Sequence, residues 1–573
     1  MRQLSGHDAG FLYTDTTQAN ANVSLLHIHD QSTAPGGVVR FKSILAHIER
    51  RLSGAALFRQ RLQRVPLGLD HPYWVDDEQF DLEYHVRHIA LPKPGDWRQF
   101  CIQVSRIHSR PLDLDRPLWE AYVIEGLDSF LDLPGGSFAL LLKTHLAAID
   151  LHRLADLTTL LYDTSATPPA PAPPEPWFAD SAPGPLGRLG LVGRGLVHSA
   201  RAPLRLARPL LRAATSVAPA AVAVASDMLL RPQHLPATRF NSVVSPHRVF
   251  ETRRFTEAEF ASIGRLVPGA TVDEAVLAVC GGALRRYLDA LGELPEGQSL
   301  AAILPEAAPG SAPAPAPAGA ATGTAPASAG AAAGPATDPG NQGAALRWRH
   351  VHLGTHIADA VQRLVAIQAE TAAAPDAVAR VLGSRVLAEA GEQASAALLA
   401  WGRRWVGQAG ARIGSRSPPA NCTLAHLPAP QQAMYLCGAR LSYYSAILPI
   451  SDGLGLAFAV TRYDGRLVIS PTSCRELMPD PEAFAQCLRD SFQEYLALVQ
   501  ATATPRRRAP PRAAAPSVAA VAPSAARKTV LVVKRAVKLV AKPAVRPVAK
   551  PRLRAASPRA SSAGTARRKR PPG

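Results

Sequence analysis

Apolar positions recur at helical spacing in several parts of the chain and form short continuous or alternating runs in others. The helical period predicts amphipathic helices over residues 41–52 and 97–108, and further helices over 151–161, 272–291 and 481–498. Short apolar runs predict strands over 118–125 and 138–142, joined by the turn-rich segment 132–136. Strands over 456–460 and 466–469 are predicted to form a hairpin across Tyr463-Asp464-Gly465.

Three low-complexity stretches interrupt this pattern and suggest the domain organisation. Residues 164–176 are rich in Pro and Ala, which ends a first domain. Residues 307–339 are almost wholly Ala, Pro, Gly, Ser and Thr, and we expect a disordered insert because they bury too little apolar area to offset the entropy of ordering. The predicted parts are a first domain over 1–163, a linker and basic connector over 164–235, a second domain over 236–500, and a disordered basic tail over 501–573.

Charge separates the tail from the body. The chain has 63 Lys and Arg against 45 Asp and Glu, a formal net charge of +18. The tail holds 19 of the basic residues and no acidic one, so residues 1–500 carry 44 basic against 45 acidic side chains. Such a tail is typical of chains that bind polyanions through counterion release, which predicts non-specific contact with nucleic acid or anionic lipid. A solvated linker without a partner is the alternative.

The remaining composition indicates a cytoplasmic protein. The first residues lack the basic start and apolar core of a secretory signal, and no apolar run reaches the length of a membrane-spanning helix. The six cysteines are scattered without C-x-x-C spacing, which predicts buried thiols and no metal site.

Candidate chemistry lies in the run His145-Leu146-Ala147-Ala148-Ile149-Asp150-Leu151. It is similar to the acyltransferase pattern His-His-x-x-x-Asp-Gly, with Leu146 in place of the second His and Leu151 in place of the Gly. The preceding predicted strand places His145 in a loop just after it, where it could be presented to a cleft.

Other segments carry the same resemblance in order along the chain. They include Leu4 to Leu12, Trp74 to Leu82, Arg116-Pro117-Leu118-Trp119-Glu120, Arg239-Phe240-Asn241, Thr271 to Leu288, Gly438 to Leu441, Ser451 to Leu454 and Arg475 to Asp480. On these motifs, residues 1–500 are identified as a member of the bacterial wax ester synthase/diacylglycerol acyltransferase family. The tail lies outside the resemblance and is similar to the Ala-Lys-Pro tails of histone H1-like proteins.

The resemblance implies an α/β fold of two similar domains, related to chloramphenicol acetyltransferase, with a central tunnel. Acyl-CoA would enter as co-substrate from one side and diacylglycerol or a long-chain alcohol from the other, with no bound cofactor. The second His of the motif acts as general base, and this position is Leu146. The candidate site residues are therefore the motif remnants His145 and Asp150, with His152 as a substitute base. For His145 the favoured interpretation is a packed histidine that supports the loop, and for Asp150 a structural role in which it pairs with an Arg or caps the following helix.

Two further departures from the family pattern lie in the second half. The family segment Ser-Asn-Val-Pro-Gly-Pro is replaced here by Ala425-His426-Leu427-Pro428-Ala429-Pro430. An Asn-Asp pair of the family is replaced by Asp273-Glu274.

The sequence leaves two candidate functions. The first is an acyl-CoA-dependent O-acyltransferase that makes triacylglycerol or wax ester; the second is a non-catalytic lipid-binding homologue that tethers lipid granules to nucleic acid or membrane through its tail.

The segment 186–230 adds a prediction about location. Its arginines are interleaved with Leu and Val and no acidic residue occurs before Asp227, so a helix here could rest on a membrane or lipid-droplet surface. An interdomain helix with a solvated basic face is the alternative. The expected location is therefore cytoplasmic, at the periphery of membranes or lipid inclusions.

Overall fold

The computed structural model describes residues 2–127, 135–167, 235–307, 346–373 and 420–503, together with a few isolated positions between them. The described residues of the body belong to one compact unit, Met1–Pro505. The predicted insert, the connector and the tail lie almost entirely outside the described residues. The division of the body into domains ending at 163 and beginning at 236 stays a prediction.

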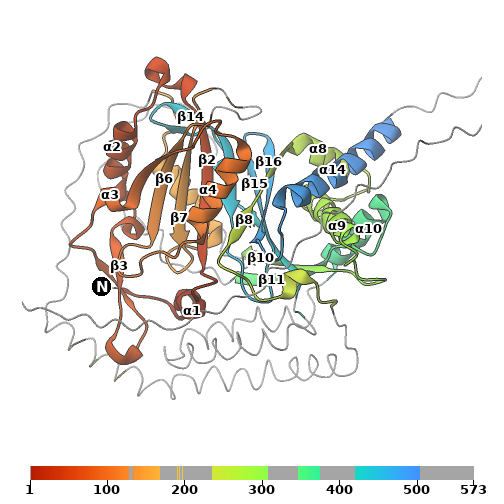
Figure 1. Ribbon diagram of the computed structural model, residues 1–573, viewed down its shortest axis with the longest axis horizontal. Helices are drawn as coiled ribbons and strands as arrows, with labels where there is room; N and C mark the ends of the chain where they lie inside the picture. The colour runs from red at the N-terminus through yellow and green to blue at the C-terminus, as the bar shows by residue number, and fades with distance from the viewer. Residues whose placement is uncertain are drawn as a thin grey trace, which may run out of the picture. The chain divides into compact units, whose positions relative to one another are not determined.

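Two mixed sheets form the centre of the α/β fold, and they lie side by side (Figure 1). The first sheet has the strand order β13-β14-β2-β7-β6-β5. Its strands are β2 (Asn22–Asp30), β5 (Val86–Ala90), β6 (Trp119–Glu125), β7 (Phe138–His145), β13 (Tyr435–Leu436) and β14 (Ala439–Ile447). The second sheet has the order β11-β10-β12-β15-β16-β8, with β9 also pairing with β16. Its strands are β8 (Arg248–Phe250), β9 (Arg253–Thr256), β10 (Ala301–Ala307), β11 (Leu346–His352), β12 (Cys422–Leu427), β15 (Ala457–Tyr463) and β16 (Arg466–Cys474).

A small third sheet lies near the N-terminus, with the order β1-β4-β3. Its strands are β1 (Arg2–Gln3), β3 (Gln60–Gln63) and β4 (Tyr73–Asp76).

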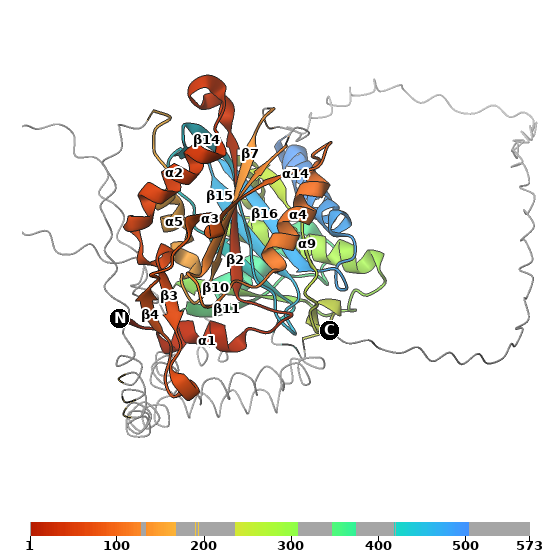
Figure 2. The ribbon, with the colours of Figure 1, turned by 60° about the vertical axis from the view of Figure 1, so that its left-hand side comes forward.

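Helices cover the outer faces of the two large sheets, and one helix lies between them. On the first-sheet side are α2 (Phe41–Arg51), α3 (Leu82–His85) and α5 (Leu154–Leu161), with α1 (Gly6–Thr14) below the sheet (Figures 1 and 2). On the second-sheet side are α8 (Glu257–Gly264), α9 (Val272–Ala290), α10 (Ala360–Ala372) and α14 (Pro481–Ala503). Helix α4 (Trp97–Ser109) buries Phe100, Val104 and Ile107 in an apolar cluster that also holds Phe250 and Val468 of the second sheet.

Local sequence explains most of these elements. Asp96 accepts a hydrogen bond from the N–H of Gln99 and so caps α4. Thr271 and Glu274 form a capping box at the start of α9. The predicted helices over 41–52, 97–108, 272–291 and 481–498 are confirmed within a few residues, whereas the one over 151–161 begins as a 3-10 turn, Leu151–Arg153, before α5.

The predicted hairpin is also confirmed, with longer strands. Tyr463 pairs with Arg466, so Asp464 and Gly465 form a two-residue loop. Both have positive φ, 51° and 68°. This conformation is that of a type I′ turn, which suits the right-handed twist of the flanking strands.

Strand β7 corrects one prediction. The strand was expected to end at Leu142, but it continues through Lys143 and Thr144, and His145 is its last residue rather than part of the following loop. The physical reason is that Lys143 is itself buried and bonded inside the fold, so a polar side chain did not mark the end of the strand.

Strand β14 joins the two halves of the chain. It comes from the second half of the sequence, but it pairs antiparallel with β2 from Arg440 opposite Asp30 to Ile447 opposite Ser24. It therefore completes the sheet that carries the candidate motif.

Candidate active site

The motif begins where β7 ends, between β2 and β6. His145 pairs with Asn22 of β2, and its N–H donates to Leu118 O at 3.2 Å. The next N–H, of Leu146, donates to Ala21 O at 2.9 Å. Leu146 lies in the turn after β7 and belongs to the same apolar cluster as Leu140 and Leu142. Side chains alternate between the faces of a strand, so His145 points to the face opposite those two leucines.

Both ring nitrogens of His145 are occupied. The ring is buried, its Nε2 lies 2.9 Å from Oδ2 of Asp15, and its Nδ1 accepts the N–H of Ala147 at 3.0 Å. A backbone N–H can only donate, so Nδ1 holds a lone pair and the Nε2–H donates to the carboxylate. His145 therefore has no free lone pair with which to take a proton from a substrate.

Asp15 is part of the same arrangement and was missed by the sequence analysis. It lies just after α1, and its Oδ1 accepts the N–H of Ala21 at 2.8 Å. The carboxylate thus connects His145 to the segment that leads into β2. A lone Asp between α1 and a polar turn gives no sequence signal for this role.

Leu146 occupies the expected general-base position and belongs to the main apolar core, with 6% of its surface exposed. Its hydrocarbon side chain can neither accept nor donate a proton. The motif as folded therefore supplies a packed apolar side chain where the family pattern has an imidazole.

Asp150 and His152 lie in the turn that follows. Asp150 Oδ1 accepts the N–H of His152 at 3.1 Å and caps the 3-10 turn. Leu151, in the position of the family Gly, is buried and does not have positive φ, so this turn does not need a glycine. The Nε2 of His152 is buried and forms no hydrogen bond with any residue that the structure describes. His152 in this turn therefore has an unengaged ring nitrogen, unlike His145 at the end of β7.

A buried polar network lies directly behind the motif, and the sequence analysis missed it too. Lys143 is fully buried; its Nζ donates to Ile107 O at 3.2 Å and to Arg110 O, at the C-terminal end of α4, and lies 3.7 Å from Glu120 Oε2. Burial lowers the pKa of Lys143 to about 8, although the charge of Glu120 opposes this shift. A cation at a helix C-terminus is favourable, so Lys143 serves to fix α4 against β7.

Next to this network, Ser24 of β2 contacts His108 of α4. Ser24 Oγ lies 2.9 Å from His108 Nδ1. Burial lowers the pKa of His108 well below its ordinary value, and the nearby charges of Arg248 and Lys143 act in the same direction. His108 is therefore neutral at physiological pH and forms part of the packing between α4 and the sheet.

The two departures in the second half of the chain contact each other. His426 Nδ1 lies 3.2 Å from Asp273 Oδ1, and Arg462 pairs with the same carboxylate. His426 shares one face of β12 with Cys422 and Leu424, and burial lowers the pKa of its ring. Glu274, the neighbour of Asp273, accepts a hydrogen bond from the hydroxyl of Thr371 and also belongs to the capping box of α9. This cluster joins the N-terminus of α9 to strands β12 and β15.

Other classes of site find no support in the described part of the chain. Among the residues placed by the structure, no group of three or more His, Cys, Asp or Glu side chains could hold a metal ion. All six cysteines are free thiols, four of them buried. None of the helices in the described ranges is long and apolar enough to cross a membrane.

Comparison with known proteins agrees with this architecture. The family model described as wax ester synthase/diacylglycerol acyltransferase catalytic domain matches residues 4–275, and the WS/DGAT C-terminal domain model matches residues 340–495. The solved wax ester synthase/diacylglycerol acyltransferase from Marinobacter aquaeolei VT8 superposes with a TM-score of 0.57 at 20% identity, covering 87% of this chain and 100% of that one.

Relatives in Mycobacterium tuberculosis are closer in sequence. A protein of strain CDC 1551 named as a diacylglycerol O-acyltransferase is 30% identical over 507 residues, which is 87% of this chain and 90% of the relative. Another protein of the same name and strain is 30% identical over 518 residues, covering 89% of this chain and 100% of the relative. By these matches and by its fold, the chain belongs to the wax ester synthase/diacylglycerol acyltransferase family.

Proposed function

We propose that the protein is an acyl-CoA-dependent O-acyltransferase that makes triacylglycerol or wax ester and has a slowed transfer step. Acyl-CoA is the co-substrate, diacylglycerol or a long-chain alcohol is the acceptor, and no bound cofactor takes part. Family membership and the shared α/β fold support the substrates. The observation that carries the slowed step is Leu146, buried at the general-base position.

The chemistry requires a proton acceptor near the acceptor hydroxyl. As the hydroxyl oxygen attacks the thioester carbonyl, its proton must leave, and the departing CoA thiolate must gain one. An imidazole does both near neutral pH because its ordinary pKa is close to 6.5. Leu146 cannot do so, and His145 has both ring nitrogens engaged. Loss of a general base typically costs about 10²- to 10⁴-fold in rate.

Two contributions to catalysis are independent of position 146. Holding the thioester and hydroxyl together lowers the entropic part of the barrier, whichever side chain occupies that position. The Nε2 of His152 has no hydrogen-bond partner among the described residues and lies in the turn after β7, seven residues after His145; in the tautomer that carries its proton on Nδ1, this nitrogen can accept a proton. We propose that the residual transfer uses this nitrogen.

The test is CoA release from palmitoyl-CoA with hexadecanol or diacylglycerol, measured for the unaltered protein and for Leu146→His. Restoring the base should raise kcat by about 10²-fold or more. Ala148→His is the matched control, because it adds an imidazole at one of the variable positions of the motif, not at the general-base position. Equal rates in the unaltered protein and in Leu146→His, with substrate binding intact, would contradict the proposal.

A second candidate function is a non-catalytic lipid-binding homologue that tethers lipid granules to nucleic acid or membrane. The 19 basic and zero acidic residues of 501–573 support it. Tail deletion should abolish retention on DNA or anionic vesicles, and retention by the full chain should fall steeply as salt rises. Binding that ignores salt would oppose it, and robust turnover by the unaltered protein would exclude the non-catalytic part.

A further inference from the structure

A pocket of about 460 Å³ lies on the outer side of the first sheet, where three distant segments meet. Helix α2 forms one wall. Asp163, which follows the C-cap of α5, forms a second, and Cys437 in the turn between β13 and β14 forms the third. The lining residues are Lys42, Ser43, Ala46, His47, Arg50, Asp163 and Cys437. None of them belongs to the 145–152 loop, so this is a different site from the candidate active site.

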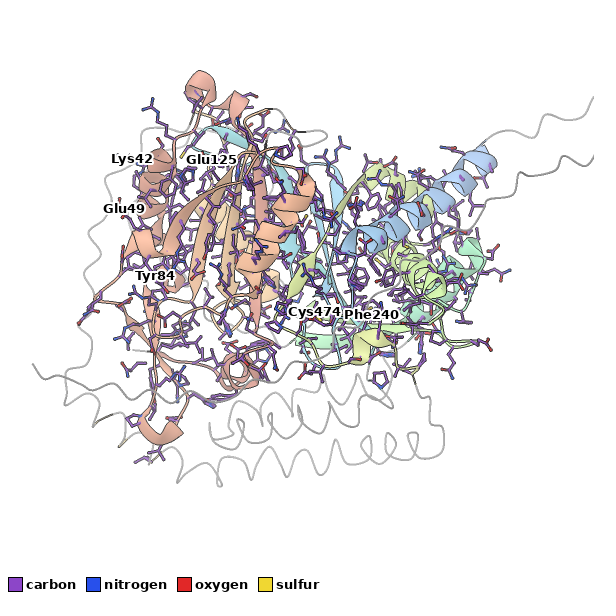
Figure 3. All side chains as sticks on the ribbon, viewed as in Figure 1. Lys42, Glu49, Tyr84, Glu125, Phe240 and Cys474 are labelled. Atoms are coloured by element: carbon purple, nitrogen blue, oxygen red, sulfur yellow. The ribbon has the colours of Figure 1, made fainter. Side chains whose placement is uncertain are left out.

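The pocket has a positive wall. Lys42 and Arg50 are two turns apart on α2, and neither forms an ion pair with another residue in the described ranges. Lys42 projects from the outer edge of α2, and Glu49 lies on the same helix but is not among the lining residues (Figure 3). Two unpaired cations on one wall of a concave site favour an anionic ligand.

The single carboxylate in the pocket is already compensated. Asp163 is buried and pairs through Oδ1 with Arg51, and His47 Nδ1 lies 3.9 Å from its Oδ2. His47 is held in turn by Leu161 O, which lies 2.8 Å from Nε2. The charges of Lys42 and Arg50 therefore remain available to a ligand.

The neutral groups of the pocket suit the same kind of ligand. Ser43, which follows Lys42 in the first turn of α2, also lines the pocket and carries a hydroxyl. This first turn contains no acidic residue, and Arg40 at the N-cap makes no side-chain capping bond. Anions are stabilised near such a helix N-terminus by the exposed N–H groups and the helix dipole.

We propose that this pocket binds the phosphate group of a small molecule between Lys42 and Arg50. An Arg guanidinium contacts a phosphate through two parallel hydrogen bonds, and a Lys ammonium adds a mobile point charge. The phosphate can come from a soluble nucleotide such as CoA or from a phospholipid headgroup. The proposal does not depend on whether the transfer step is active.

Calorimetric titration of the full chain with CoA and with inorganic pyrophosphate, and co-sedimentation with vesicles of phosphatidic acid in phosphatidylcholine, separate these sources. The test variant is Lys42→Gln/Arg50→Gln. The matched control is Arg98→Gln/Arg106→Gln, which removes two exposed cations with the same eight-residue spacing on α4. The tail is intact in both, so its own affinity for polyanions cancels in the comparison.

The test variant should bind at least one probe about tenfold more weakly than the control, a loss of about 1.4 kcal/mol. If the test variant binds CoA and pyrophosphate more weakly than the control, the ligand is a soluble phosphate compound. If it binds only the vesicles more weakly, the ligand is a phospholipid headgroup. An equal loss in both double variants, or no loss in either, would overturn the proposal.

Thiol protection gives a second measurement that reads the pocket directly. Cys437 lines the pocket, whereas Cys487 lies on α14 and is similarly half-buried. The probe that binds should slow alkylation of Cys437 and leave Cys487 unchanged, as read by mass spectrometry. Equal protection of both thiols, or of neither, would show that the probe binds elsewhere and would defeat the assignment.

Discussion

His145 donates from Nε2 to Oδ2 of Asp15 across 2.9 Å, and this contact fixes the orientation of the first motif residue. The carboxylate also accepts the N–H of Ala21, so one side chain joins α1, the approach to β2 and the end of β7. The first His of the motif is thereby a structural residue of the sheet edge. The chemical role falls to position 146 or to the turn that follows.

Replacing Asp15 with Ala should destabilise the protein by about 1–3 kcal/mol, because it leaves a buried imidazole N–H and a backbone N–H without an acceptor. The free energy of unfolding in urea is the measurement. Asp156→Ala is the control, since Asp156 is half-exposed and its ion-pair partner is the neighbouring Arg153. A loss no larger than that of the control would show that the His145–Asp15 contact contributes little.

His152→Gln should reduce residual CoA release by the unaltered protein by about tenfold or more, if its Nε2 takes the hydroxyl proton. The same change made in Leu146→His should have little effect, because the restored imidazole then supplies the base. His247→Gln, on an exposed side chain, is the control. A similar decrease in both backgrounds would mean that His152 acts on folding rather than on transfer.

Lys143 should make stability rise with pH between about 8 and 10.5. Its folded pKa is lowered to about 8 from 10.5, so in this window the unfolded chain binds more protons than the folded one, and raising the pH favours the fold. Relative to Lys143→Met, the unaltered protein should gain up to about 3 kcal/mol across the window. Urea unfolding at several pH values measures this gain. Lys42→Met, at an exposed position, is the matched control, and a flat difference for Lys143→Met would refute the assignment.

His29 should make the fold sensitive to acid. The ring is fully buried and stacks between Phe138 and Tyr162, and burial lowers its pKa to about 3. Because the unfolded chain binds the proton more tightly, stability should fall as the pH drops from 6.5 toward 3. His29→Phe should remove about 2 kcal/mol of the loss between pH 6.5 and 5.

Thermal or urea unfolding at these two pH values provides the measurement for His29→Phe. His247→Phe, which changes an exposed imidazole, is the matched control. An unchanged acid slope in His29→Phe would place the sensitivity in His27 or His108, whose pKa values burial also lowers.

The local parts of this fold follow from the sequence, and the long-range parts do not. Helices α2 and α4 have strong apolar periodicity, and the Asp464-Gly465 turn has a characteristic composition, so all three were predicted. Strand β2 was not predicted, because His27, His29 and Ser24 interrupt its apolar pattern. Ser24 contacts His108 of α4, and both histidines contact Tyr162, the C-cap of α5.

The site shows the same division. The identity of the residue at position 146 can be read directly from the motif. The engagement of His145 depends on Asp15, which is 130 residues away in sequence, and the contact of His426 with Asp273 spans two elements of the second sheet and its helices. Such pairings depend on the folded topology, and single-chain periodicity carries no information about them.

The pairing of β14 with β2 has a consequence for dissecting this protein. A fragment that stops at the end of the first half would lack β14, leaving unpaired the backbone N–H and C=O groups of β2 between Ser24 and Asp30 that face β14, while β7 still pairs with the other edge. Open edges of this kind recruit other strands and lead to aggregation. The first half is therefore not an autonomous piece for expression, and the motif should be studied in a chain that extends at least through Ile447.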